Sequence, residues 1–227
     1  MNKQDVLHYA QNMGDRLKGT PDFDYEVHED PSNSGIIKIS SKNYPATAAK
    51  YDIKRNKVTT TSGSRIDGNG ALNECVNNDV LLKNATYLID KCIFVKTDSQ
   101  GRPWRWRVFF NHTHKPVMHG PRPKRELIGA EDCDQAGHVL AVSLGGGHER
   151  INVVPMPREI NERWYRFQEV YLVSSLQAMN DEDEWYMELH TEIDYRSSSL
   201  RPEAIRLQCD LDNGRGYSAA LETECVY

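Results

Sequence analysis

The sequence lacks several patterns that would assign it to large classes of protein. None of its hydrophobic runs is long enough to span a bilayer, and its first residues contain no apolar core suited to a signal peptide. Its five cysteines include no CxxC pair, which predicts mainly free thiols and leaves one disulfide open. We therefore expect no membrane partner, and a protein of the cytoplasm or one exported by a signal-independent route.

An excess of positive charge is also missing. The chain has 28 lysines and arginines against 33 acidic residues, for a net charge of −5. Because contacts to phosphate dominate nonspecific affinity for polyanions, this balance argues against a general polyanion binder. It is compatible with a local basic groove or a bound cation. The hydrophobic share of 38% is typical of a soluble globular protein.

A glycine-rich segment separates the chain into two parts. Residues 62–74 have the composition of a linker, so we expect a boundary near residue 80. The part over 1–80 is predicted to be an N-terminal extension or small accessory region, with a short helix over 3–18. The part over 81–227 is predicted to be the main domain.

The main domain shows strand patterns on both sides of one helical pattern. Apolar runs within 84–110 flank the turn-forming residues TDSQGRP and predict a β-hairpin. A helix is expected from near Pro157 to about Met179, because proline is favoured in a first helical turn. The other expected strands are 137–144, 150–154, 184–195 and 201–211. A helix set between antiparallel strands predicts an α+β fold.

Tryptophan and arginine alternate in the segment GRPWRWRVFF. Trp104 and Trp106 therefore share one face of the expected strand, and Arg105 and Arg107 share the other. Stacking of these aromatic rings on nucleic-acid bases is one interpretation. The interpretation we adopt is a tryptophan face in the core with the arginines in solvent.

Residues suited to catalysis are concentrated between Cys133 and Glu169. His138 begins one expected strand, and Asn161 and Glu169, eight positions apart, project from roughly the same side of the expected helix. An imidazole can take a proton from water, an amide oxygen suits magnesium, and a carboxylate can hold metal-bound water. Metal-assisted hydrolysis of phosphodiesters requires such a set.

The motif D-x-x-G-H at 134–138, followed by INVVPM, Asn161 and Glu169, resembles the DNA/RNA non-specific endonucleases of the ββα-metal (His-Me finger) superfamily. The branch to which it is most similar occurs in bacterial toxins, and the resemblance covers about residues 85 to 215. It implies a ββα-metal core, in which antiparallel strands pack on a helix. It also implies sequence-nonspecific cleavage of DNA, with RNA as a further substrate left open.

The resemblance implies a role for each matching residue. His138 would be the general base that activates water, and Asn161 the ligand of a single Mg²⁺ ion, for which Mn²⁺ is a substitute. Asn152 would orient His138 or the local backbone. Glu169 would hold metal-bound water, and Asp134 would brace the loop before the histidine.

The sequence departs from the family pattern at the position of a phosphate-binding arginine. Members with the form D-R-G-H carry that arginine, whereas this chain has Gln135 and Ala136 before Gly-His. Our candidates for substrate binding in its place are Arg122, Lys124 and Arg125.

Two other functions stay open from the sequence. The missing arginine and the acidic net charge favour, as the alternative, a catalytically inactive nuclease-like module that binds nucleic acid or protein. Cys133, close to His138, leaves a thiol hydrolase as a third hypothesis, although no orienting partner is evident. The toxin-type resemblance adds a dedicated inhibitor (immunity) protein as an expected partner.

Overall fold

The structure is a computed structural model that describes residues 25–41, 47–60, 81, 83–89, 92–111, 129–148, 150–179, 186–211 and 216–222. The expected helix over 3–18, the expected linker over 62–74 and the candidates Arg122, Lys124 and Arg125 lie outside the described residues.

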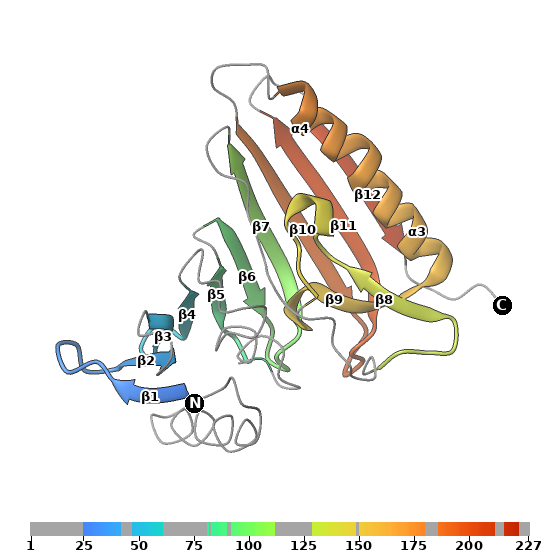
Figure 1. Cartoon of the computed structure of the whole chain (residues 1–227). Helices are drawn as coiled ribbons and strands as arrows, with labels where there is room; N and C mark the ends of the chain where they lie inside the picture. Colours follow the sequence, from blue (N-terminus) through green and yellow to red (C-terminus); the bar gives the residue numbers. More distant parts are fainter. Residues whose placement is uncertain are drawn as a thin grey trace.

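One sheet extends through most of the described chain (Figure 1). Its order is β1-β2-β3-β4-β5-β6-β7-β10-β11-β12. The strands are β1 (Tyr25–Glu29), β2 (Ile36–Ser41), β3 (Thr47–Asp52), β4 (Lys57–Thr60), β5 (Thr86–Ile89), β6 (Ile93–Thr97), β7 (Pro103–Asn111), β10 (Tyr186–Tyr195), β11 (Pro202–Leu211) and β12 (Gly216–Glu222). Neighbours are antiparallel except β4 and β5, which pair in parallel and join the strands before residue 80 to those after it. The domain boundary near residue 80 stays a prediction.

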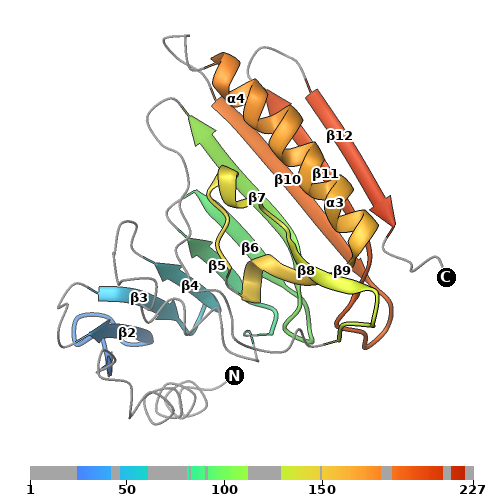
Figure 2. The ribbon, with the colours of Figure 1, turned by 45° about the vertical axis from the view of Figure 1, so that its right-hand side comes forward.

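A second, two-stranded sheet and a continuous helix cover one face of the part of the large sheet that contains β7 and β10 to β12 (Figures 1 and 2). The small sheet pairs β8 (Asp134–His138) with β9 (Val153–Pro157), and two 3₁₀ turns, η1 (Val142–Leu144) and η2 (Arg150–Asn152), lie between them. The helix consists of α3 (Arg158–Arg166), the π-helical segment η3 (Phe167–Leu172) and α4 (Val173–Met179). Two antiparallel strands followed directly by a helix form the expected ββα arrangement, and the α+β fold class is confirmed.

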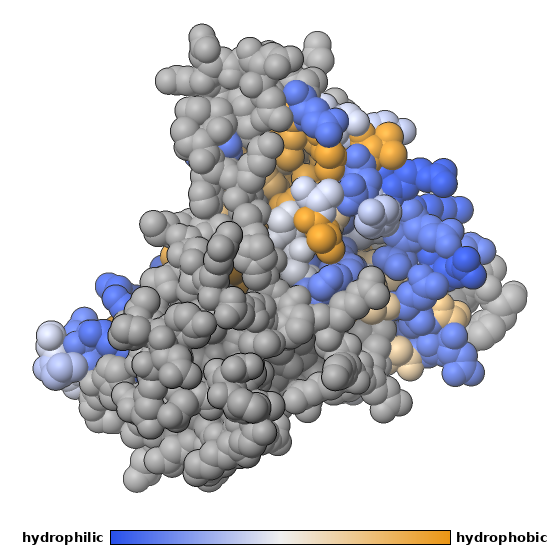
Figure 3. All heavy atoms as spheres, in the orientation of Figure 1, coloured by the Kyte–Doolittle hydropathy of each residue, from blue (hydrophilic) through white to orange (hydrophobic). Residues whose placement is uncertain are grey.

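The main core lies between the large sheet and this covering layer. Alternate residues of β7, β10 and β11 are buried, including Trp106, Leu189 and Leu207, and the helix contributes Trp164 and Leu172. Such alternation is typical of a sheet with one buried face. The outer surface differs along the helix: hydrophilic side chains gather over α3, and hydrophobic ones lie toward α4 (Figure 3).

The longer predicted elements of the main domain are confirmed. The helix begins directly after Pro157, which is its N-cap, and ends at Met179. The hairpin around TDSQGRP joins β6 to β7, and the predicted strands over 184–195 and 201–211 are β10 and β11. Trp106 is 1% exposed, so the interpretation of its strand face as core is also confirmed.

The predictions of strands over 137–144 and 150–154 were wrong in their bounds. The first strand ends at His138, and the second begins at Val153 and runs to Pro157. Between them, buried amide side chains, rather than a neighbouring strand, bond the backbone of Leu140 and Ala141.

Within the described residues, no helix has the length and apolar character needed to cross a membrane.

Candidate active site

The helix and the segment 135–143 lie side by side and are joined by contacts in parallel order. We call this line of contacts the seam. From the start of the helix, its hydrogen bonds join Asn161 to Gln135, Trp164 to the carbonyl of His138, Gln168 to the amide of Ala141, and Glu169 to Ser143. Because the bonded positions advance together, sliding the helix along β8 would break all of these bonds.

The glycine before His138 is required by the packing of β8 on β9. A Cβ at Gly137 would lie 2.4 Å from Sδ of Met156, which is completely buried. His138 then ends the strand. Its backbone carbonyl accepts a hydrogen bond from Trp164 Nε1 at 3.0 Å, so a core side chain of α3 fixes the backbone on which the imidazole stands.

Asn152 is fully buried and holds the backbone of the loop that follows His138. Its Oδ1 accepts from the amide of Leu140 at 2.8 Å, and its Nδ2 donates to the carbonyls of Leu140 and Gly147 at 2.9 and 2.8 Å. Its carbonyl also accepts from the amide of Val139. Of the two roles expected for this asparagine, the contacts correspond to orienting the local backbone.

Gln168 of the helix is a second buried amide that bonds the same loop, and we did not predict a role for it from the sequence. Its Oε1 accepts from the amide of Ala141 at 2.8 Å, and its Nε2 donates to the carbonyl of Val139 at 3.2 Å. The signal was present in the sequence: Gln168 falls between Trp164 and Leu172 on the apolar face of the helix. A polar residue there needs buried partners.

Asn161 and Glu169 lie partly exposed at opposite ends of the seam. Asn161 Nδ2 donates to Gln135 Oε1 at 3.3 Å, which leaves its amide oxygen as the atom suited to a cation. The carboxylate of Glu169 accepts a hydrogen bond from the hydroxyl of Ser143.

Tyr165, one turn after Asn161, is 53% exposed. The charge of Glu169, then burial, then a hydrogen bond to Glu169 raise the pKa of Tyr165.

Asp134 is held at the start of β8 by a bidentate ion pair with Arg201. Nε and Nη2 of Arg201 donate to the two carboxylate oxygens at 2.7 and 3.0 Å, and the amide of Glu131 donates to Oδ2 at 2.9 Å. The Asp134 side chain is completely buried and that of Arg201 is 11% exposed. Arg201 was not predicted from the sequence, because it is distant from Asp134 in the chain and meets it only through the fold.

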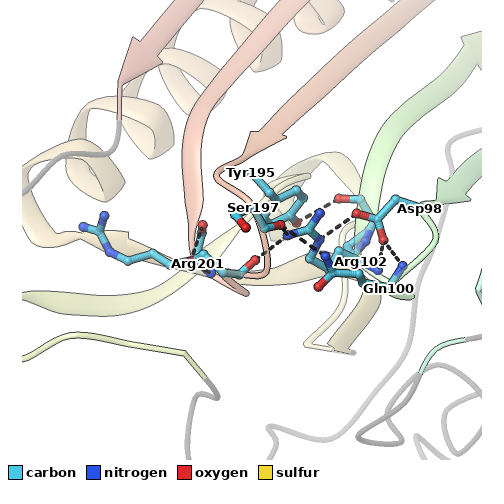
Figure 4. Close-up of polar contacts among 8 residues, drawn as sticks. Asp98, Gln100, Arg102, Tyr195, Ser197 and Arg201 are labelled. Atoms are coloured by element: carbon cyan, nitrogen blue, oxygen red, sulfur yellow. Dashed lines mark hydrogen bonds and ion pairs between the residues drawn. The ribbon is translucent and has the colours of Figure 1, made fainter.

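The turn that carries Arg201 is joined to the β6–β7 turn (Figure 4). Arg102 Nη1 donates to the carbonyls of Ser197 and Ser199 at 2.7 and 2.6 Å, and its Nε donates to Asp98 at 2.6 Å. Its guanidinium also lies over the ring of Tyr195, 4.6 Å from the centroid. Two hairpin turns are thus fixed to each other at the end of the sheet where β8 begins.

Cys133 is bonded in a disulfide, whereas Cys92 and Cys209 are buried free thiols. The partner of Cys133 therefore lies outside the described residues. Since a disulfide has no thiolate to act as nucleophile, the hypothesis of a thiol hydrolase at Cys133 was wrong for this oxidised form. Burial raises the pKa of Cys209 to about 12, which makes that thiol unreactive as well.

Comparison with known proteins gives a family and two structural likenesses. A family model described as DNA/RNA non-specific endonuclease matches residues 83–213 of the 227. A solved structure of "Sda1 nuclease with bound zinc ion" is 18% identical with a TM-score of 0.35, over 40% of this chain and 39% of that one. An "extracellular endonuclease" is 16% identical with a TM-score of 0.40, over 56% and 74%. No curated protein matches the chain.

Proposed function

The chain belongs to the DNA/RNA non-specific endonuclease family, and from this premise we propose that it is a metal-dependent endonuclease that hydrolyses phosphodiester bonds of DNA without sequence preference. RNA is a second substrate to be tested. The observation that carries the proposal is the seam, which fixes the backbone or side chains of His138, Asn161 and Glu169 along one line of contacts between β8, η1 and the helix.

In this proposal His138 is the general base. It takes a proton from the water molecule whose oxygen attacks phosphorus, and such a base contributes about 10²- to 10⁴-fold to the rate. Trp164 fixes its carbonyl, and Asn152 and Gln168 fix the residues that follow it. The backbone that carries the imidazole is therefore fixed before substrate binds, which reduces the cost of orientation during the reaction.

The donor atoms near the start of the helix fit magnesium better than a soft metal. Among the described residues no group of three or more histidine, cysteine and acidic side chains could hold a metal ion. Mg²⁺ keeps most of its waters and needs few protein oxygens, which the amide oxygen of Asn161 supplies, while Glu169 would hold water of the ion. When bound, the ion supplies positive charge to the scissile phosphate and the leaving oxygen.

We assign phosphate binding to Arg122, Lys124 and Arg125, on the ground of sequence alone, because Gln135 and Ala136 carry no charge. They precede β8 in the sequence, and the chain as a whole is acidic, with a net charge of −5. A short basic stretch would then provide the local attraction for the backbone of the substrate.

A plasmid assay tests the activity. Purified protein should nick and linearise plasmid in Mg²⁺ or Mn²⁺ and leave it intact with a chelator. His138→Ala should abolish cleavage, and activity should rise from acid to mildly alkaline pH, because the base must be neutral and an unperturbed imidazole has a pKa of about 6.5. His190→Ala, on the opposite face of β10, is the matched control and should cleave normally.

Intact plasmid in every lane at enzyme excess, with retained binding to DNA, would favour the inactive binding module instead. Wild-type rates for His138→Ala would leave the family in place and remove this mechanism. Asn161→Ala should lose cleavage at low Mg²⁺ and recover part of it at high Mg²⁺, since an ion bound less tightly can be restored by concentration.

The Cys133 disulfide supports the exported alternative for location, because disulfides persist in oxidising compartments. We propose that the protein acts outside the cytosol that makes it, and that an inhibitor protein accompanies it there. Mass spectrometry of alkylated protein without reductant tests the first part. Co-purification from the native host tests the second, and purification as a single chain would contradict it.

A further inference from the structure

A second histidine lies against the proposed general base. His148 Nδ1 and His138 Nε2 are 2.8 Å apart, and the ring centroids are 4.8 Å apart with the planes at 68°. Both residues are partly buried. The separation is that of a hydrogen bond between two ring nitrogens, so one of them donates and the other accepts.

One residue, Asn152, bonds the backbone next to both histidines. Asn152 accepts the amide of Val139, the residue after His138, on its carbonyl oxygen, and it donates from Nδ2 to the carbonyl of Gly147, the residue before His148. Gly146 comes so close to the chain that a Cβ there would lie 1.9 Å from the Leu140 carbonyl oxygen. The glycine-rich loop is therefore folded back in a fixed path that brings His148 to His138.

A neutral imidazole that acts as a base at one nitrogen carries its proton on the other. If His138 takes the proton of water at Nδ1, its proton sits on Nε2 and needs an acceptor. In the tautomer that carries its own proton on Nε2, His148 presents the lone pair of Nδ1, 2.8 Å away, as that acceptor. Catalytic bases are commonly oriented in this way by a third group, which also stabilises the cation that forms during the reaction.

We propose that His148 is a positioning residue for His138, which accepts its Nε2–H, selects its tautomer and shares the charge of the imidazolium. This inference rests on the proposed endonuclease function. In the step concerned, the water oxygen bonds to phosphorus, the bond from phosphorus to the leaving sugar oxygen breaks, and the water proton moves to His138 Nδ1. The leaving oxygen takes its proton from solvent water.

A hydrogen bond to the charged form of a group favours that form. The acceptor at residue 148 therefore influences the pH at which His138 becomes protonated and cleavage is lost. Charged groups on the elements packed against β8 stay the same in every variant. They are Arg158, Glu159, Glu162, Arg163, Arg166 and Glu169 on the helix and Glu131, Asp132, Asp134 and Arg201 at the start of β8. Glu149 and the Arg150 side chain lie outside the described part. Differences in cleavage rate and pH midpoint among variants at residue 148 are therefore due to the group that accepts the hydrogen bond there.

The test is a pH–rate profile of plasmid cleavage for the wild type, His148→Ala, His148→Gln and His148→Asp. We expect His148→Ala to cleave about 10- to 100-fold more slowly, less than the full loss of a general base, with the midpoint of its acid limb at lower pH. His148→Gln keeps an acceptor oxygen and should recover part of the rate. His148→Asp, with a charged acceptor, should move the midpoint to higher pH.

Ring nitrogen NMR shifts of His138 supply a readout that does not depend on activity. The wild type should carry its proton on Nε2, and His148→Ala should show a mixture of tautomers, with circular dichroism confirming that each variant is folded. His190→Ala is the control for loss of an imidazole elsewhere. Equal rates, midpoints and tautomers in wild type and His148→Ala would overturn the inference. An inactive wild type would instead overturn the proposed function, and the NMR result would then decide the pairing by itself.

Discussion

Asn152 and Leu140 form a reciprocal pair in which the side chain of one satisfies both backbone groups of the other. The Leu140 amide donates to Oδ1 at 2.8 Å, and Nδ2 donates back to the Leu140 carbonyl at 2.9 Å. This geometry imitates the pairing of two strands at the point where β8 has ended. It lets the chain turn away from the small sheet while its polar groups remain bonded, which buried backbone requires.

Replacement of Asn152 should therefore be costly for folding. Asn152→Ala leaves the amide and carbonyl of Leu140 and the carbonyl of Gly147 without this partner. Since an unsatisfied buried group costs about 1–3 kcal/mol, we expect the free energy of unfolding to fall by about 3 kcal/mol in urea denaturation. Asn161→Ala, on the partly exposed part of the helix, should change it by less than about 0.5 kcal/mol. Equal stability of the two variants would contradict the buried role of Asn152.

Gln168 should affect the reaction more than an exposed glutamine of the same helix. Gln168→Leu removes the bonds to Ala141 and Val139 without opening a large cavity. We expect a loss of about 1–3 kcal/mol in stability and a lower kcat, because the backbone after His138 is no longer fixed. Gln177→Leu, exposed on α4, is the control. A normal kcat in a folded Gln168→Leu protein would show that the loop needs no such support.

The ion pair of Asp134 and Arg201 should be far more important than a surface pair from the same turn. Arg201→Ala leaves a carboxylate that is completely buried without its cation, and such changes cost about 3–5 kcal/mol. Arg196→Ala breaks the exposed pair with Glu203 and should cost about 1 kcal/mol or less. In chemical denaturation, a double variant Asp134→Ala/Arg201→Ala should lose less than the sum of the single changes. Additive losses would show that the two side chains act independently.

Ionisation of Asp98, in the β6–β7 turn, should make the free energy of unfolding depend on pH in the acid range. Burial alone would raise the pKa of Asp98, but hydrogen bonds from the Arg102 amide and side chain and from the Gln100 amide outweigh it and hold the pKa below the ordinary value of 3.8. The charged form therefore stabilises the fold above that value, and the contribution disappears as pH falls through the lower pKa of the folded state.

Asp98→Asn should consequently be less stable than wild type by about 1–3 kcal/mol at pH 7, and the difference should shrink as pH falls below about 4. Thermal unfolding at a series of pH values measures it. Asp194→Asn, in an exposed pair with Arg206, should differ little from wild type across the range. A difference for Asp98→Asn that is the same at pH 3 and pH 7 would contradict the assignment.

Sequence patterns predicted the features that depend on local periodicity or on a spaced motif. The helix that ends at Met179, the β10–β11 hairpin, the buried Trp106 and the endonuclease family are of this kind. The end of β8 was misplaced because residues 139–144 are apolar and strand-like. Their backbone is instead bonded by Asn152 and by Gln168 from the helix, a competition that periodicity does not register.

Residues whose roles arise from contacts across the chain were not found. Arg201 lies 67 residues after Asp134, and His148 reaches His138 only because the glycine loop folds back. The roles proposed for His138, Asn161 and Glu169 stay predictions, as do the contributions of Arg122, Lys124 and Arg125.

The joined turns at Arg102 and Ser197 have a practical consequence. Ser197 shares its turn with Arg201, and Arg201 anchors the strand that ends at the proposed base. A substitution that removes the hydrogen bonds of Arg102 to Ser197 and Ser199 would let β8 lose its position at a lower temperature, while the proposed reacting groups stay unchanged. Arg102 is therefore the position at which to begin in seeking a variant that brief warming inactivates.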